Sequence, residues 1–219
     1  GFDPLHPDAQ ARLLAQIDSL NIGAIDLNKM KLTAGLSEQM VDVAFSANNT
    51  GIIGEGSVRG SIKDGYDLDL NAMLERLSLQ QLAGAEKDIA LGTTLDVNLR
   101  SDAQWTALST KGGLRYNHFD TPRQSVMMKD IVFDFATGAD TTTAHLAAGD
   151  LLMQFGTKGY LSDLSAAIEP FAEFINAGIA QLHIAHDSLK TLTPYVHVRL
   201  DAGNDNPVSN IMRAMGYEI

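Results

Sequence analysis

Two groups of side chains in this sequence have the types and the spacing that bind metal ions. In the first group, Asp67, Asp69 and Asn71 stand where a calcium-binding loop has its first three ligands. The position that must turn sharply is Ala72, and the twelfth position is Ser78 instead of glutamate. We therefore interpret this spacing as the polar side of a β-strand, on which every second side chain points the same way.

The second group is a histidine pair near the end of a predicted helix. His183 and His186 lie three residues apart and are followed by Asp187. The nearest further candidate ligand is His197, which lies on the polar side of a predicted strand, so no third ligand is evident. Exposed histidines at a helix end explain the pattern, although the sequence leaves open whether they bind anything. We predict no metal site and no cofactor.

The sequence contains no recognisable catalytic motif. Gly54 and Gly56 begin a pattern like that of a dinucleotide-binding loop, but the third glycine, Gly60, comes one place late and no helix is predicted after it. Glycines that let strands approach closely explain this run. Asp140 and His145 have no serine or cysteine partner in a known catalytic order. We therefore expect a protein that is not an enzyme and has no catalytic residue.

Composition excludes further classes of function. The chain has 219 residues, a net charge of -11 and a pI of about 4.8, and its basic residues are scattered, so a nucleic-acid partner is not expected. It has no cysteine and therefore no disulfide. No run of about 20 apolar residues is present. The chain begins at Gly1 and ends on residues typical of another strand, so we expect an internal piece of a larger protein.

The elements that position these residues are predicted from the alternation of apolar and polar residues. Such alternation is typical of strands with one apolar and one polar side. Turn residues separate the strands at 35–39, 48–51, 64–65, 111–113, 138–140 and 149–150. Strands are predicted near 28–34, 41–47, 52–62, 66–71, 89–100, 104–109, 113–117, 129–136, 141–148, 151–157 and 196–200.

The apolar sides of these strands are the candidate functional surface. They must be covered in a core or occupied by a ligand. Trp105, the sole tryptophan, is assigned to this core or groove in preference to a sugar-binding platform. The candidate lining residues are Val41, Val43, Phe45, Leu68, Leu70, Leu95, Val97, Leu99, Ile131, Phe133 and Phe135.

Helices are predicted at four places. A short opening helix is expected at 7–17, one or two turns at 79–85, and a capped helix at 206–216 with Asn206 as its N-cap. The longest amphipathic pattern spans 161–182. We thus expect a single repetitive β-rich module over residues 1–219, with a helical insertion at 161–182.

Several segments resemble the TamB/AsmA-like translocation and assembly proteins. The resemblance lies in the turn and strand at 48–56, the strand at 94–99, and above all Ala139-Asp140-Thr141-Thr142-Thr143-Ala144 followed by Gly149-Asp150-Leu151. It extends to the stretch at 182–215. These are strand-and-turn patterns, and they are closest to the large TamB-type proteins of Bacteroides-like bacteria.

The resemblance implies both a fold and a function. It implies a long curled antiparallel sheet, a taco- or solenoid-like trough with a hydrophobic interior, in a periplasmic protein anchored in the inner membrane by a segment outside this chain. It also implies phospholipid acyl chains and the outer-membrane assembly machinery as partners. The predicted helix at 161–182 departs from a plain β-trough.

Three hypotheses follow. The leading one is a non-enzymatic envelope segment whose hydrophobic β-groove serves phospholipid transfer or outer-membrane protein assembly. The alternative is a structural spacer or interaction module with a closed core and no lipid. A polysaccharide-degrading β-helix would need clustered carboxylates and aromatic residues on one face, and no such cluster is evident. Periodicity alone does not distinguish an open groove from a closed core.

Overall fold

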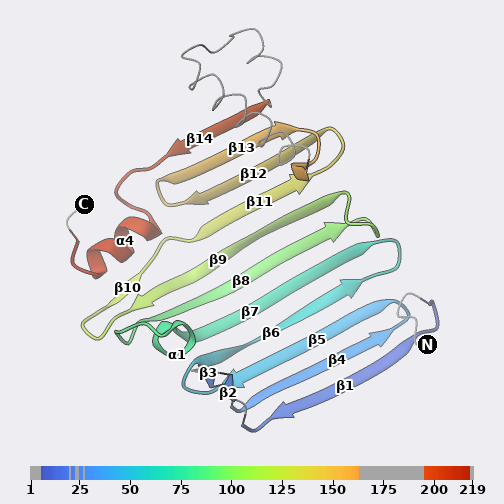
Figure 1. The fold of residues 1–219 in the computed structure, drawn as a ribbon, viewed down its shortest axis with the longest axis horizontal. Coiled ribbons are helices and arrows are strands. Elements are labelled where there is room, and N and C mark those ends of the chain that lie inside the picture. The colour runs from blue at the N-terminus through green and yellow to red at the C-terminus, as the bar shows by residue number, and fades with distance from the viewer. Residues whose placement is uncertain (1–5, 20, 23–24, 27, 163–194, 218–219) are drawn as a thin grey trace, which may run out of the picture.

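The chain folds into one large antiparallel β-sheet (Figure 1). The structure is a computed structural model, and it describes residues 6–19, 21–22, 25–26, 28–162 and 195–217. The main sheet contains the strands β1 (Gln10–Ile17), β4 (Met30–Ser37), β5 (Met40–Asn48), β6 (Ile52–Ser61), β7 (Tyr66–Ser78), β8 (Ala90–Ser101), β9 (Leu108–Asp120), β10 (Ser125–Met127), β11 (Ile131–Thr137), β12 (Thr141–Ala148), β13 (Leu151–Lys158) and β14 (Val196–Asp201).

The remaining described elements are small. The strands β2 (Asn21–Ile22) and β3 (Ile25–Asp26) pair with each other in a separate ribbon. The helix α1 (Leu79–Ala83) joins β7 to β8, and α4 (Pro207–Ala214) follows β14. Both helices confirm predictions from the sequence. The predicted helix at 161–182 lies almost wholly outside the described residues.

The order of strands in the main sheet follows their order in the chain. The sheet runs β1-β4-β5-β6-β7-β8-β9-β11-β12-β13-β14, and the short β10 pairs with β9. Within the described residues β1 and β14 each pair on one side only, so the sheet has two edges and does not close on itself. The prediction of a mainly β fold built on one long antiparallel sheet is confirmed.

Tight turns hold the register of neighbouring strands. Glu38 and Gln39 connect β4 to β5 with φ angles of 51° and 59°, the left-handed backbone that a two-residue hairpin requires. At the β5–β6 turn, the Asn49 side-chain oxygen accepts hydrogen bonds from the backbone amides of Gly51 at 2.9 Å and Ile52 at 2.7 Å. This asparagine therefore supplies the turn with acceptors that the ladder cannot provide.

The predicted opening helix at 7–17 is wrong, because this segment is the strand β1. Its residues have good helix propensity, but Ala11, Leu13, Ala15 and Ile17 also alternate, and they pair with the apolar residues of β4. Leu14, which the helical interpretation placed on the apolar side, is 73% exposed on the opposite face. Pairing with β4 decides the structure, since strand formation depends on neighbours more than on local preference.

The predicted turn at 111–113 is also wrong. Residues predicted as two strands, 104–109 and 113–117, belong largely to the single strand β9, and the turn lies earlier, at 102–107. Gly112 pairs with Val97 of β8 on one side and with Phe133 of β11 on the other. A glycine pair inside a strand thus resembles a turn in the sequence, although ladders on both sides keep it extended.

A small polar network attaches α4 to the sheet. The Asp150 carboxylate, in the β12–β13 turn, accepts hydrogen bonds from the Asp205 amide at 2.7 Å and from the Asn206 side chain at 3.0 Å. Asn206 in turn caps α4 through a reciprocal pair of hydrogen bonds with Ser209. Lys129 pairs with the Asp205 carboxylate at 2.9 Å. The hydrogen bond from the Asp205 amide, followed by that from Asn206, holds the pKa of Asp150 below its ordinary value.

Acidification is therefore expected to loosen α4. Because the pKa of Asp150 is lowered in the folded state, its contribution is present above the ordinary carboxyl pKa of about 3.9 and is lost as pH falls through the lower folded value. Nuclear magnetic resonance should show the Asp205 and Ser209 amide resonances moving in this acid range. The Asp150→Asn variant should lose that movement, while Asp64→Asn, in the β6–β7 turn, should keep it. Equal titration of these amides in Asp150→Asn would contradict the assignment.

Candidate functional site

The strand register places apolar residues in continuous rows across the sheet. Residues paired in antiparallel strands point to the same face, so each ladder carries a row from one edge strand to the other. The central row consists of Leu13, Ala34, Val43, Val58, Leu70, Val97, Gly112, Phe133, Leu146, Met153 and Leu200.

A row of the same character lies on each side of the central row. The three rows together are called the apolar face, and the opposite side is called the polar face. The first flanking row is Ala15, Leu32, Phe45, Gly56, Ala72, Leu95, Leu114, Ile131, Ala148 and Leu151. The second is Ala11, Leu36, Val41, Gly60, Leu68, Leu99, Thr110, Phe135, Ala144, Phe155 and Val198.

All of the candidate lining residues predicted from the sequence fall in these three rows. Val43, Leu70, Val97 and Phe133 are in the central row. Phe45, Leu95 and Ile131 are in the first flanking row, and Val41, Leu68, Leu99 and Phe135 are in the second. The rows contain no aspartate, glutamate, lysine, arginine or histidine. Their surface is therefore free of charge from one edge of the sheet to the other.

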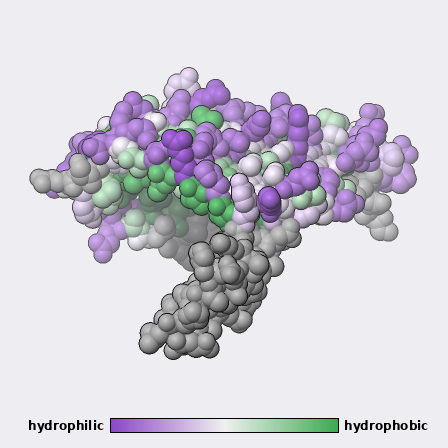
Figure 2. All heavy atoms as spheres, turned by 90° about the horizontal axis from the view of Figure 1, so that it is seen from above, coloured by the Kyte–Doolittle hydropathy of each residue, from purple (hydrophilic) through white to green (hydrophobic). Residues whose placement is uncertain are grey.

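The apolar face is not buried as a protein core would be. The fully buried apolar residues among those described are small, apart from Phe119 at 3% exposure. Leu70, Val97 and Phe133 are half-buried, and exposure rises at the edges, to 54% for Leu13 and 66% for Val198. Figure 2 shows hydrophilic residues along one side of the sheet and hydrophobic residues gathered on the other, where the surface is hollowed. A large apolar surface thus lacks a cover among the described residues.

The polar face carries ion pairs between neighbouring strands. Asp42 pairs with Arg59 at 3.3 Å, and Asp67 pairs with Arg100 at 3.2 Å. Asn98 donates to Asp69 at 2.9 Å. These side chains are well exposed, so each pair contributes about 0–1 kcal/mol to stability. These charged side chains help to fix the register of the strands, because a slip by one residue would move the charges onto the apolar face.

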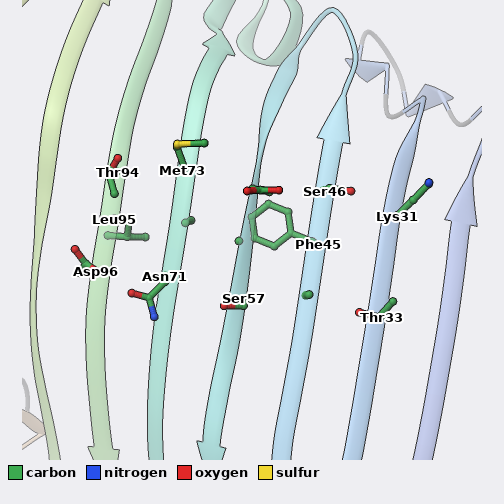
Figure 3. A pocket seen from close by; sticks show the side chains of 14 residues that line it. Lys31, Thr33, Phe45, Ser46, Ser57, Asn71, Met73, Thr94, Leu95 and Asp96 are labelled. Carbon is green, nitrogen blue, oxygen red and sulfur yellow. The ribbon is translucent and has the colours of Figure 1, made fainter.

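The polar face also has a shallow open hollow across β4 to β8 (Figure 3). Its lining mixes hydroxyl and amide side chains with apolar ones such as Ala44 and Met73, and its charged members are Lys31, Glu55 and Asp96. No group of three or more histidine, aspartate, glutamate or cysteine side chains within the described residues is placed to hold a metal ion. Asp67, Asp69 and Asn71 lie on the polar side of β7, as predicted. His183 and His186 lie outside the described residues.

Two features of the apolar face were not predicted from the sequence. The first is that aromatic rings cover glycines on neighbouring strands: Phe45 lies over Gly56, and Phe133 lies over Gly112. The second is the position of Trp105 in the 102–107 turn, with its ring 4.6 Å from that of Tyr66, centre to centre. Gly56 was recognised as a site of close strand approach, whereas Gly112 was predicted to lie in a turn. The aromatic partners of both glycines could be found only by knowing the register.

No protein family, characterised protein or solved structure matches this chain. None of the helices in the described parts of the chain has the length and apolar character needed to cross a membrane. The geometry of the two faces is therefore the basis for any functional conclusion.

The glycine beneath Phe45 is expected to be essential for packing. A Cβ at Gly56 would lie 2.5 Å from the Phe45 ring and 2.9 Å from the Asn71 backbone oxygen, so Gly56→Ala should displace the ring or the strand. We expect a loss of about 1–3 kcal/mol in the free energy of unfolding, measured by urea denaturation. Gly156→Ala is the matched control, since this strand glycine has open space around its Cβ position and should change stability by less than about 0.5 kcal/mol. Equal effects of the two substitutions would contradict this packing.

Proposed function

We propose that this chain is a non-enzymatic segment of a cell-envelope protein whose apolar face holds phospholipid acyl chains. The single observation that carries the proposal is the charge-free surface of three rows, continuous from β1 to β14 and without a cover among the described residues. Hydrocarbon is the ligand class suited to such a surface, because polar groups placed against it would lose their hydrogen bonds to water.

The dimensions of the apolar face suit lipid chains lying along the strands. From Tyr66 to Leu74 on β7, eight steps of about 3.4 Å give a length of roughly 27 Å. One leaflet of a bilayer core is about 15 Å thick, so an extended acyl chain fits within this length. Strands about 4.8 Å apart make the sheet roughly 48 Å long in the other direction, which leaves room for several chains side by side.

The energetic argument also favours a lipid over a polar solute. Each methylene removed from water contributes about 0.8 kcal/mol, so ten methylenes contribute roughly 8 kcal/mol before the cost of association. A single site of chemistry is not needed for this activity. The residues in contact with the lipid would be those of the rows, each contributing a small part.

The resemblance to TamB/AsmA-like proteins supports the biological setting of the proposal. In that setting the chain would be a periplasmic slice of a protein anchored in the inner membrane. Its task would be phospholipid transfer between the membranes or a part in outer-membrane protein assembly, with the assembly machinery as a protein partner. The alternative is an apolar face that is covered by protein and serves as a structural spacer or interaction module.

Site-specific photocrosslinking tests the proposal directly. The photoreactive amino acid benzoylphenylalanine would be placed at Phe45 or Val97 on the apolar face, and at the adjacent positions Ser46 or Asp96 on the polar face. After mixing with radiolabelled phospholipid vesicles, crosslinking to lipid is expected at Phe45 and Val97. The polar-face positions control for random contact, because each lies next to a test position but points the other way.

The possible outcomes separate the two functions. Lipid crosslinks confined to the apolar face would support the conduit. Equal lipid crosslinking at both faces, or no lipid crosslinking at either face, would contradict the proposal that the apolar face holds lipid. Crosslinks from Phe45 and Val97 to protein alone would favour the spacer or interaction module.

A further inference from the structure

The two ends of the strands differ in how tightly they are packed. At the end where α1 joins β7 to β8, Ser78 and Ala90 are each 1% exposed and Phe119 is 3% exposed. The ends of β7, β8 and β9 on this side of the sheet are therefore tightly packed. At the opposite end of the strands, a fourth row lies beside the second flanking row on the same face, and it is rich in hydroxyl groups. It consists of Tyr66, Ser101, Leu108, Thr137, Thr142, Thr157 and Val196.

Over β11 and β12, this hydroxyl row is closed by the chain itself. The Thr137 and Thr142 hydroxyls lie 2.7 Å apart, and Thr142 also donates to the Gly159 carbonyl at 2.9 Å. The Leu161 amide donates to the Thr137 hydroxyl at 3.2 Å. Thr142 is fully buried as a result. The part of the row over β7 and β8, with Tyr66 and Ser101, has a different cover.

That cover is an exposed aromatic residue held in an uncommon backbone conformation. Trp105 has a φ of 58°, which is rare for a bulky residue, and its side chain stacks on Tyr66 with ring centres 4.6 Å apart. Asp102 holds the turn, because its carboxylate accepts hydrogen bonds from the Thr106 amide at 2.7 Å and from the Thr106 hydroxyl. Trp105 nevertheless remains 50% exposed. The turn thus presents a large aromatic ring to solvent at the end of the apolar face.

The surroundings of this pair suit the boundary between a lipid's chains and its headgroup. Tyr66 shares its face with Leu68 and Leu70, so apolar surface begins directly beneath the ring. The β6–β7 turn beside it carries exposed charges of both signs, Lys63 and Asp64, available to an ammonium and a phosphate group. Tryptophan and tyrosine favour such a position, because one part of each ring system is apolar and the other forms hydrogen bonds with water.

We propose that the Tyr66–Trp105 pair is the mouth of the apolar face, where a phospholipid enters and where the junction of its headgroup and acyl chains comes to lie. The lipid chains then extend from Tyr66 along β7 toward Leu74, and the headgroup stays outside beside the β6–β7 turn. This inference rests on the proposed function, and it adds the place of entry and the direction in which the lipid lies.

The fluorescence of Trp105 tests the proposal, because this is the sole tryptophan of the chain. Delipidated protein would be loaded from vesicles of phosphatidylcholine brominated near the ester end or near the methyl end of its chains. The protein would then be separated from the vesicles, and bound lipid would be counted by phosphorus assay. Bromine quenches tryptophan at short range, so ester-end bromine is expected to quench Trp105 more strongly than methyl-end bromine at equal occupancy.

Variants test entry independently of fluorescence. Trp105→Ala should slow the uptake of radiolabelled phosphatidylcholine by about fivefold, the effect of losing one aromatic contact. Tyr116→Ala, which removes another exposed aromatic side chain, at 72% exposure on β9, should leave the rate unchanged. Circular dichroism would confirm that both variants keep the sheet.

The outcomes distinguish lipid entry at the Tyr66–Trp105 pair from lipid binding by the apolar face as a whole. Loading with stronger ester-end quenching and slower uptake by Trp105→Ala supports the proposal. Loading without quenching, with stronger methyl-end quenching, or at the same rate in Trp105→Ala overturns the mouth while the lipid-binding function stands. Absence of any loading overturns both.

Discussion

The structure depends on the register of its strands. In an antiparallel sheet every second residue shares a face, so a shift of one residue in any pair would exchange apolar for charged side chains. Here the register shifts at three irregularities, between Ile53 and Gly54, Leu74 and Leu77, and Gly92 and Thr94. Between these points the pairing keeps Asp42, Asp67 and Asp96 on one face while Val43, Leu70 and Val97 share the other. Two-residue turns fix this pairing at the ends of the strands, and the packing of Phe45 over Gly56 fixes it in the middle of the sheet. The separation into two faces is therefore a property of the whole sheet.

Much of this fold could be predicted from the sequence, because alternation is a local signal. Hairpin turns at 48–51 and 64–65 interrupt it clearly, and Asn206 followed by Pro207 marks the start of α4. The failures arose where local and non-local signals disagree. Residues 10–17 have helical composition but pair with β4, and residues 111–113 have turn composition but are extended between two ladders. In both places the neighbouring strand decides, and a neighbour cannot be read from a short window of sequence.

The candidate site was predictable to the same extent and for the same reason. Each lining residue alternates with a polar neighbour, so its side of the strand followed from the sequence. The order of the strands in the sheet did not follow from the sequence. The rows, the rings over the glycines and the stacking of Trp105 on Tyr66 could therefore be seen only in the paired strands of the structure. For the stacking of Trp105 on Tyr66, the one signal in the sequence was the position of Trp105 three residues after Asp102, a residue type common in turns.

The coincidence of chain order with strand order has a consequence for how the protein is made. Strands next to each other in the main sheet are, with few exceptions, next to each other along the chain, so most ladders close over a short loop. Loop-closure entropy is then small at each step, which favours rapid folding for a β protein. Folding can start at any hairpin and spread outward by adding one strand at a time, as in repeat proteins. A chain emerging from the ribosome or from a translocation channel can therefore assemble its sheet progressively, each new strand finding a finished edge as its template.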